Sequence, residues 1–280
     1  MNNNSSKPLL SIENIIVKYP SSKGTFFRKN KNTFNAVDDV SLDVYPGESV
    51  GLVGESGCGK TTLSRAAVKL IQPNSGKIFF DGIDIASKKE KEIKHLRRYF
   101  QIIFQDPYAS LNPKMTLFSI LSEPLKEFGL TDKKNMLSEI SALLETVGLS
   151  SKSIKKYPHE FSGGQRQRIA IARALACKPK LLIADEPVSA LDVSVQAQII
   201  NLLSDLQTQM NLSILFVSHN LAVVKHICSR VIVMKDGKIV ESNSTEEIFN
   251  NPSSNYTKTL ISSIPIPDPA FRFKSEKNKI

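Results

Sequence analysis

A glycine-rich segment near the start of the chain carries residues suited to binding phosphate. Residues 54–61 read GESGCGKT and match the pattern GxxxxGK[ST]. Glycines let a backbone fold around an anion, and the N-terminus of a helix favours negative charge. Lys60 supplies a cation for the outer phosphates, and the Thr61 hydroxyl can ligate Mg²⁺. An apolar strand before the segment and a helical run after it argue against a coincidental glycine-rich turn.

This segment predicts a nucleotide-binding site, but it does not identify the class of nucleotide-binding protein. Kinases, GTPases, helicases and motor proteins share such a loop, and a guanine-specifying NKxD sequence is not apparent in this chain. The residues of the loop that we expect to bind the nucleotide are Gly54, Glu55, Ser56, Gly57, Cys58, Gly59, Lys60, Thr61 and Thr62.

Two adjacent carboxylates follow a second apolar run, Leu181–Ala184. Asp185 can hold Mg²⁺ directly or through water. Glu186 points differently, because side chains alternate along a strand, and it can polarise a water for attack on a γ-phosphate. The alternative is that these are two solvated acids at the end of a strand. The phosphate-binding pattern upstream favours the catalytic interpretation.

The order of predicted elements favours an α/β fold. The first part reads as short strands, at Leu9–Val17, Val40–Val44, Ser49–Val53 and residues 76–80 and 101–104. The later half alternates strands at 181–184, 213–217 and 230–234 with helices at about 194–209 and 221–227. Such alternation predicts a mostly parallel sheet covered by helices. Residues 117–148 have helical spacing, interrupted at Pro124 and Gly129, and predict an inserted helical region.

Composition limits the classes of function. The 280 residues contain 41% hydrophobic and 23% charged residues, as in a soluble globular protein. No window approaches the roughly 18 consecutive apolar residues of a membrane-spanning helix. The three cysteines form no CxxC pair, which argues against a disulfide framework or a zinc site. The net charge of +10 permits a nucleic-acid partner, but no basic motif interleaved with aromatic residues supports one, so we expect none.

One further motif suggests a family. Residues 161–165 read FSGGQ, precede an apolar helix and lie shortly before Asp185. This motif resembles the LSGGQ signature of ABC ATPases, with Phe161 in place of the usual leucine. A serine and two glycines at a helix N-terminus again offer a hydroxyl and free N–H groups to an anion. The residues that carry this resemblance are Phe161, Ser162, Gly163, Gly164 and Gln165.

Other segments resemble the family's motifs in their usual order. Gln105, at the end of an apolar strand, is similar to the Q-loop glutamine, which implies a role in catalysis and in Mg²⁺ binding. Residues 189–192 resemble the D-loop and end in Asp192, while His219 resembles the switch histidine that contacts the γ-phosphate. Tyr19 resembles the A-loop aromatic that stacks on adenine, although an aromatic residue at a strand end is more often simply packed.

The resemblance implies a fold and a mechanism. The fold would be an ABC ATPase cassette over residues 9–249, with a RecA-like core, an N-terminal antiparallel β subdomain and a helical subdomain at about 106–178. Two cassettes of this family meet head to tail, so that each ATP lies between one chain's phosphate loop and the other's signature. With one set of motifs, this chain would need a second ABC ATPase subunit. Glu186, His219, Gln105 and Lys60 would be the catalytic residues.

Several segments narrow the subfamily. Residues 105–113 (QDPYASLNP), residues 187–196 and the tail from Asn250 resemble the ATPases of oligopeptide and dipeptide importers, and the insertion from Lys23 resembles their F type. Residues 250–280 would be a C-terminal extension. This resemblance implies ATP and Mg²⁺ as ligands, two transmembrane permease subunits, an extracytoplasmic solute-binding protein, and a peripheral location on the cytoplasmic face of the inner membrane.

Three alternatives stay open at the level of sequence. Some relatives in this subfamily transport nickel or glutathione-like cargo. A soluble ABC ATPase acting in translation or DNA repair would usually carry two cassettes or a long coiled coil, and neither is visible here. A cassette that binds ATP without hydrolysing it would be expected to lack one of the catalytic residues, whereas Glu186, His219 and Gln105 are all present.

Overall fold

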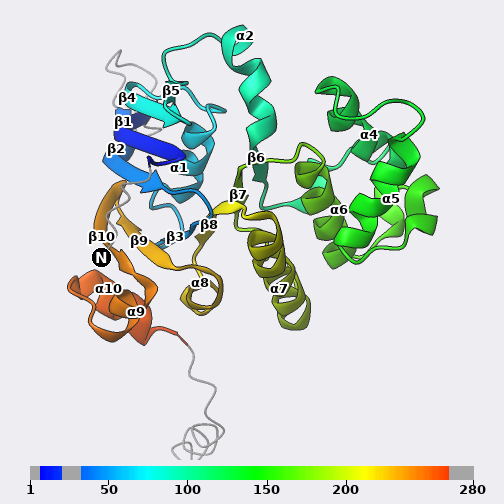
Figure 1. The fold of residues 1–280 in the computed structure, drawn as a ribbon. Helices are drawn as coiled ribbons and strands as arrows, with labels where there is room; N and C mark the ends of the chain where they lie inside the picture. Colours follow the sequence, from blue (N-terminus) through cyan, green and yellow to red (C-terminus); the bar gives the residue numbers. More distant parts are fainter. Residues whose placement is uncertain (1–6, 21–32, 265–280) are drawn as a thin grey trace, which may run out of the picture.

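The architecture comes from a computed structural model, which describes residues 7–20 and 33–264. Most of the insertion that begins at Lys23 lies outside these residues, and so do the prolines at 265, 267 and 269 and the basic tail from Arg272 to Lys279. The α/β class expected from the sequence is confirmed, with two sheets and a separate group of helices (Figure 1).

A six-stranded, mostly parallel sheet forms the centre of the molecule, in the order β10-β9-β3-β8-β7-β6. All its neighbouring pairs are parallel except β10–β9. Every residue of its three central strands is buried, which explains their apolar sequences. The strands are β3 (Ser49–Val53), β6 (Phe100–Ile103), β7 (Leu181–Asp185), β8 (Ser213–Ser218), β9 (Arg230–Lys235) and β10 (Lys238–Ser244).

The register of this sheet brings distant segments to one edge. Val53 pairs with Ser218, and Asp185 pairs with Val217. Ile103 at the end of β6 pairs with Ala184 of β7. Because the strands are parallel, the loops that follow β3, β6, β7 and β8 all leave from the same edge.

A four-stranded antiparallel sheet, in the order β2-β1-β4-β5, packs beside the central sheet. Helix α1 (Lys60–Ala67) buries Leu63 and Ala66 in the core that both sheets share. The strands are β1 (Leu10–Pro20), β2 (Thr33–Val44), β4 (Ser75–Phe80) and β5 (Ile83–Asp84). Strand β2 begins seven positions before the predicted start at Val40, because its first half pairs with the end of β1.

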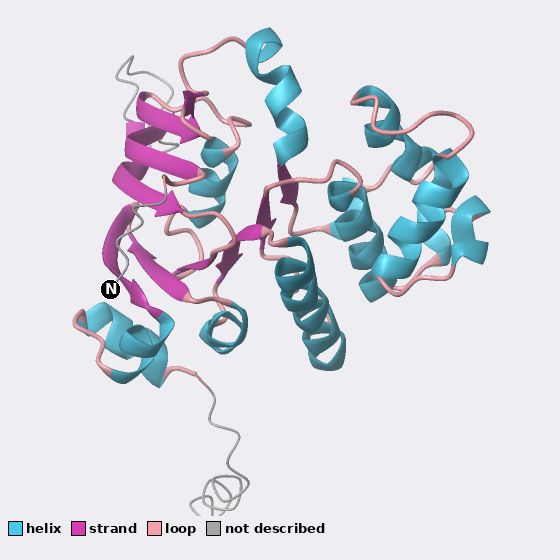
Figure 2. Cartoon of the chain, in the orientation of Figure 1, coloured by secondary structure: helices cyan, strands magenta, loops and turns pink. Residues whose placement is uncertain are grey.

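The helices between β6 and β7 form a lobe of their own, on the right in Figures 1 and 2. They are α3 (Pro107–Ser110), α4 (Leu117–Glu127), α5 (Met136–Thr146) and α6 (Gly163–Leu175), with short 3₁₀ turns at Ser151–Lys155 and Pro158–Glu160. Arg173 of α6 donates to the carbonyl of Ser110 at 2.5 Å, and Arg168 donates to the carbonyl of Val147 at 2.7 Å. These two arginines connect α6 to α3 and to the end of α5.

The prediction that Pro124 interrupts the helical region is wrong. Helix α4 runs through Pro124 and ends after Glu127, and Gly129 then adopts a φ of +59°. A proline inside a helix removes one backbone hydrogen bond and costs about 3 kcal/mol. Complete or nearly complete burial of Leu117, Leu121 and Leu125 in the lobe core offsets that cost.

The remaining helices flank the central sheet. They are α2 (Glu90–Ile93) with the 3₁₀ turn Lys94–Tyr99, α7 (Val193–Met210), α8 (Leu221–Ile227), α9 (Thr245–Asn250) and α10 (Asn255–Ser262). The sequence indicates one short helix after Asn250, which corresponds to α10. Within the described ranges, no helix combines the length and the apolar character needed to cross a bilayer.

The packing of α8 against β3 generates a first testable prediction. A Cβ atom added at Gly51 would lie 2.3 Å from Cγ1 of Val224, a stiff and fully buried side chain. We therefore expect Gly51→Ala to lower the free energy of unfolding by roughly 1–3 kcal/mol through overpacking. Denaturant unfolding followed by circular dichroism measures this change.

Gly163→Ala is the matched control. A Cβ atom at Gly163 has its nearest neighbour at 3.4 Å, an ordinary contact, and the residue lies in the first turn of α6. Its unfolding free energy should stay within about 0.5 kcal/mol of the unaltered chain. Equal stability of the two variants would contradict the tight packing at Gly51.

Candidate functional site

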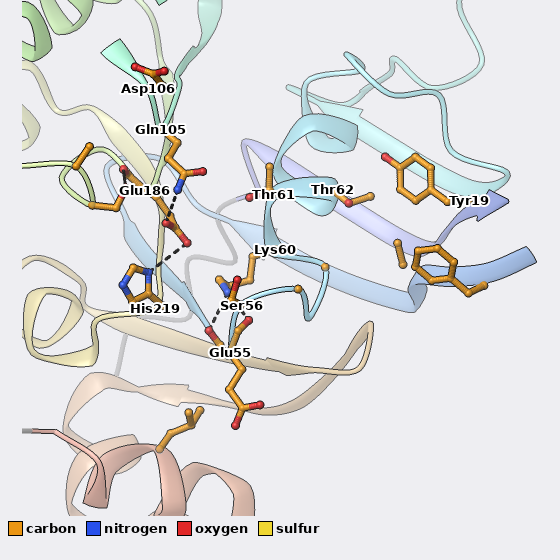
Figure 3. Close-up of a pocket in the computed structure, with 18 of the residues that line it drawn as sticks. Tyr19, Glu55, Ser56, Lys60, Thr61, Thr62, Gln105, Asp106, Glu186 and His219 are labelled. Carbon is orange, nitrogen blue, oxygen red and sulfur yellow. Dashed lines mark hydrogen bonds and ion pairs between the residues drawn. The ribbon is translucent and has the colours of Figure 1, made fainter. Parts of the chain in front are cut away.

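The loop between β3 and α1 is shaped by backbone approaches that only glycine permits. Gly54 adopts a φ of +154°, and a Cβ atom there would lie 2.1 Å from the carbonyl oxygen of Met234. Gly59, at the start of α1, has a φ of +106°, and a Cβ atom would meet the carbonyl oxygen of Ala36 at 2.1 Å. The loop is thus wedged between β9 and β2, with the N-terminus of α1 opening into the cavity (Figure 3).

Lys60 lies beneath this loop and is only 4% exposed. Its ammonium group donates to the carbonyls of Gly54 and Glu55, both at 2.8 Å. These contacts hold the positive charge at the centre of the curved backbone, where phosphate oxygens would approach it (Figure 3). The geometry fits the phosphate-binding role predicted for the loop.

Asp185, at the end of β7, is 1% exposed. Burial raises the pKa of its carboxyl group, although the hydrogen bond from Thr61 opposes that effect. The Thr61 hydroxyl donates to Oδ1 at 3.1 Å, while Oδ2 is buried with no hydrogen-bond partner among the described residues. A buried carboxylate oxygen without a donor, next to a hydroxyl, is the arrangement that a hard cation such as Mg²⁺ satisfies. The residues therefore fit the metal expected from the sequence.

Glu186 lies at the centre of a polar cluster built from three loops. Its φ of +49° is unusual for a residue with a side chain and directs the carboxylate into the cavity. Gln105 donates through Nε2 to one carboxylate oxygen at 3.0 Å, and Nδ1 of His219 lies 3.3 Å from the other. The parallel register brings together these side chains, which are far apart in the sequence (Figure 3).

An aromatic pair borders the opposite end of the cavity. Tyr19 and Phe34 have ring centroids 6.1 Å apart, and both rings line the cavity together with Ala36. Phe34 is 54% exposed, which is a large fraction for an apolar ring. An exposed aromatic surface beside a phosphate loop is suited to stacking on a planar base. The position of Tyr19 is consistent with the predicted adenine contact.

The FSGGQ segment forms the first turn of α6, away from this cavity. The Ser162 hydroxyl accepts from the amide of Gln165, and the Gln165 side chain accepts from the amide of Ser162, so the two residues form a capping box. Phe161 is buried and packs in the core of the lobe. Residues 161–165 and Asp192 are not among the residues that line the cavity within this chain. Their predicted nucleotide contacts therefore stay predictions.

Comparisons with known proteins now become informative. The ABC transporter family matches residues 37–189, and the oligopeptide/dipeptide transporter C-terminal region matches residues 240–279. The chain belongs to the ABC transporter family. Among curated relatives, a putative peptide import ATP-binding protein of Brucella ovis is 49% identical over 95% of this chain and 81% of its own length. The oligopeptide transport ATP-binding protein OppF of Bacillus subtilis is 49% identical over 89% of this chain and 81% of its own.

Solved structures agree with this assignment. The ATP-binding cassette MJ0796, in a dimeric structure bound to ADP and phosphate, superposes with a TM-score of 0.75 at 27% identity. The superposition covers 84% of this chain and 98% of MJ0796. The ABC ATPase fold predicted from the sequence is confirmed, and the chain is an ATP-binding subunit of this family.

The cavity of this cassette includes residues that sequence reasoning missed. It has a volume of about 1010 Å³ and is lined by most of the predicted loop residues together with Gln105, Glu186 and His219. The missed lining residues are Phe34, Ala36, Asp106, Ser189, Ala190, Leu260 and Ser263. Ser189 and Ala190 belong to the segment recognised as the D-loop. Leu260 lies in α10 and Ser263 directly follows it, and no sequence signal connects this helix to the cavity.

The cysteine of the loop generates a second prediction. Cys58 is 7% exposed, and burial raises the pKa of its thiol even though Lys60 opposes the change. A raised pKa leaves less thiolate near neutral pH, so N-ethylmaleimide should modify native Cys58 at least about tenfold more slowly than in the unfolded chain. The rate should still be rising above the pH at which an ordinary thiol has ionised. Mass spectrometry of the cysteine peptides measures both effects.

The other two cysteines provide internal references. Burial raises the pKa of Cys177 to about 11 and raises that of Cys228 as well. Both thiols should therefore react in the native protein no faster than Cys58. Labelling of native Cys58 at the rate of the denatured protein would contradict this description of the loop.

Proposed function

We propose that this chain hydrolyses ATP at the cavity between β3 and β7 and thereby powers the import of oligopeptides or dipeptides through an ABC transporter. The observation that carries the proposal is the Glu186 carboxylate, 14% exposed and held between Gln105 and His219, at the edge of the sheet where the phosphate loop also begins. A general base, a cation and a ring of amides converge there, as phosphoryl transfer requires.

The residues support a specific division of labour. The loop amides and Lys60 bind the β- and γ-phosphates, while Tyr19 and Phe34 stack on the adenine. Glu186 accepts a proton from a water molecule while the water oxygen bonds to the γ-phosphorus. The bond between the γ-phosphorus and the oxygen that bridges the β- and γ-phosphates breaks. The products are ADP and inorganic phosphate. His219 lies beside Glu186, where it can contact the γ-phosphate and help hold the carboxylate in position.

Thr61, Asp185 and Gln105 would hold Mg²⁺. The Gln105 amide nitrogen contacts Glu186, so its carbonyl oxygen stays available as a metal ligand. When bound, Mg²⁺ neutralises charge that develops on the phosphate oxygens. Asp185 ends β7 and is adjacent to Glu186, and Thr61 lies in the first turn of α1, so the two would hold the cation beside the general base.

A second cassette would complete the site. The Ser162–Gly164 corner and Asp192 do not line this chain's own cavity. The corner lies at the N-terminus of α6, where an anion can bind, and Asp192 precedes α7. The similar cassette MJ0796 forms a dimer bound to ADP and phosphate, which supports a pair of cassettes. We infer that the pair is head to tail, so that each signature covers the other chain's nucleotide. We infer that the partner is a different ATPase subunit, as in systems with two ATPases.

The C-terminal region and the similar curated proteins indicate the class of cargo. The C-terminal region shared with oligopeptide/dipeptide transporters and the near-50% identity to peptide import ATP-binding proteins support peptides over nickel or glutathione. Two transmembrane permease subunits and an extracytoplasmic solute-binding protein would complete the importer. This chain would then be peripheral to the inner membrane, on its cytoplasmic face.

Substitution of the general base gives a third prediction. Glu186→Gln, assayed with the partner cassette, should keep ATP affinity but lower hydrolysis at least about 100-fold, because an amide cannot accept the proton. Glu145→Gln, an exposed position on α5, is the matched control and should hydrolyse ATP normally. Phosphate release measures turnover, and unchanged turnover in Glu186→Gln would reject Glu186 as the base.

Removal of the metal-binding carboxylate gives a fourth prediction. In the unaltered chain, ATP affinity should fall when Mg²⁺ is chelated. Asp185→Asn should lose most of this difference, with at least about a tenfold weaker response to Mg²⁺. Asp205→Asn, exposed on α7, should respond as the unaltered chain does. Isothermal titration calorimetry with and without EDTA measures the response, and a normal response in Asp185→Asn would contradict the metal assignment.

A further inference from the structure

The C-terminal helix α10 is fastened to the central sheet by a carboxylate of β10. Oε1 of Glu241 accepts from both the amide and the hydroxyl of Ser253 at 2.8 Å, and Oε2 accepts from the amide of Ser254 at 3.0 Å. Thr257, in the first turn of the helix, is fully buried. These contacts fix the N-terminal end of α10 in a single position against β9 and β10.

From that position α10 reaches the phosphate loop. The hydroxyl of Tyr256 accepts from the backbone amide of Glu55 at 3.1 Å, across 201 residues of sequence. The ammonium group of Lys235 lies 4.9 Å from the centre of the Tyr256 ring and helps orient it. Burial raises the pKa of the Tyr256 hydroxyl. The hydroxyl accepts the bond from Glu55 through an oxygen lone pair. Leu260 and Ser263 of the same chain segment line the nucleotide cavity.

The peptide group that Tyr256 contacts is central to the loop. It joins Gly54 to Glu55, and its own carbonyl, that of Gly54, accepts from the Lys60 ammonium at 2.8 Å. The next carbonyl along the loop, that of Glu55, also accepts from Lys60 at 2.8 Å and from the amide of Cys58 at 3.3 Å. On the same side, the amide of Gly237 in the β9–β10 turn donates to the carbonyl of Cys58 at 3.0 Å. Residues after β8 therefore hold the outer surface of the loop at two points.

We propose that Tyr256 is a positioning residue of the nucleotide site, through which α10 sets the conformation of the phosphate loop. The proposal rests on the proposed ATP site. A loop with three glycines has many conformations of similar energy, and each bond from a rigid neighbour removes some of them. Tyr256 fixes the plane of the Gly54–Glu55 peptide group, and the Gly54 carbonyl of that group in turn holds the Lys60 ammonium. The C-terminal extension thus contributes to phosphate affinity without touching phosphate.

Coupling of this kind is reciprocal. If docked α10 favours the loop conformation that binds nucleotide, bound nucleotide must favour docked α10 to the same extent. A tyrosine that served only to pack α10 would affect the stability of the helix but not the affinity for nucleotide. The two roles are therefore separable by experiment.

The test compares Tyr256→Phe with the unaltered full-length chain. The variant removes one oxygen atom and keeps the ring, so α10 can still dock. We expect the dissociation constants of both Mg-ATP and Mg-ADP to rise about three- to tenfold, as for the loss of one hydrogen bond, with a fall of at most a few degrees in the thermal unfolding midpoint without nucleotide. Tyr45→Phe is the matched control, since Tyr45 lies at the opposite end of β3. Isothermal titration calorimetry measures the affinities.

Two further measurements separate the explanations. Glu241→Ala should weaken nucleotide binding to a similar degree by releasing the start of α10, and the double variant with Tyr256→Phe should be no weaker than Glu241→Ala alone. Saturating Mg-ADP should slow amide hydrogen exchange in residues 255–262 of the unaltered chain, and this slowing should be reduced in Tyr256→Phe.

Lys60→Ala distinguishes failure of this inference from failure of the proposed function. If Lys60→Ala and the unaltered chain bind Mg-ATP equally, the cavity is not the nucleotide site. If Lys60→Ala weakens binding but Tyr256→Phe binds as tightly as the unaltered chain, the ATP site stands and the positioning role of Tyr256 is overturned.

Discussion

The parallel register of β3, β6, β7 and β8 is the constraint on which the site depends. Four loops that are distant in sequence begin at one edge of the central sheet because these four strands lie side by side and parallel, in the order β3-β8-β7-β6. The phosphate loop, Gln105, Glu186 and His219 therefore meet without any helix or subdomain needing to move toward the others. A shift of one residue in this register would turn side chains of the central strands to the opposite face and separate the cluster.

The loop itself depends on a second constraint, which is close backbone approach. Gly54 and Gly59 lie against the carbonyls of Met234 and Ala36, so both sheets contribute to the shape of the phosphate cradle. The Asp236-Gly237 turn and α10 contact the same loop from its outer side. Elements before and after the phosphate loop thus determine how rigid the loop is. A rigid loop binds nucleotide more tightly, because no free energy is lost in ordering it.

The charged groups of the cavity are arranged as the proposed hydrolysis of ATP requires. Lys60 is buried where phosphate would enter, and both oxygens of Glu186 are held by neighbours. Asp185 has one buried oxygen that finds no hydrogen-bond partner in the described part of the chain. In the proposed reaction, the Gln105 and His219 contacts would keep the base in place until phosphate and metal arrive. In the proposed dimer, the signature at the start of α6, capped by its own serine and glutamine, would supply the second anion-binding corner.

Local sequence determined a large part of this structure. The apolar runs of β3, β7 and β8 and the helix starts at Lys60, Gly163 and Leu221 were predictable, because burial on both faces and capping leave direct signals in residue order. The phosphate loop and the Asp185-Glu186 pair could be recognised because each is a short run of adjacent residues. The family could be recognised because several such runs occur in its usual order.

Other features were decided only by tertiary contacts. Helix α4 passes through Pro124 because burial of its leucines outweighs the backbone hydrogen bond lost at the proline. The sequence shows the proline but not the burial of the leucines. The first half of β2 forms because it pairs with β1, and Phe34 lies at the cavity as a consequence. The contact between Tyr256 and Glu55 joins residues separated by most of the chain, and no local pattern encodes it. Such contacts depend on where whole elements pack, which is a property of the folded core rather than of any short segment.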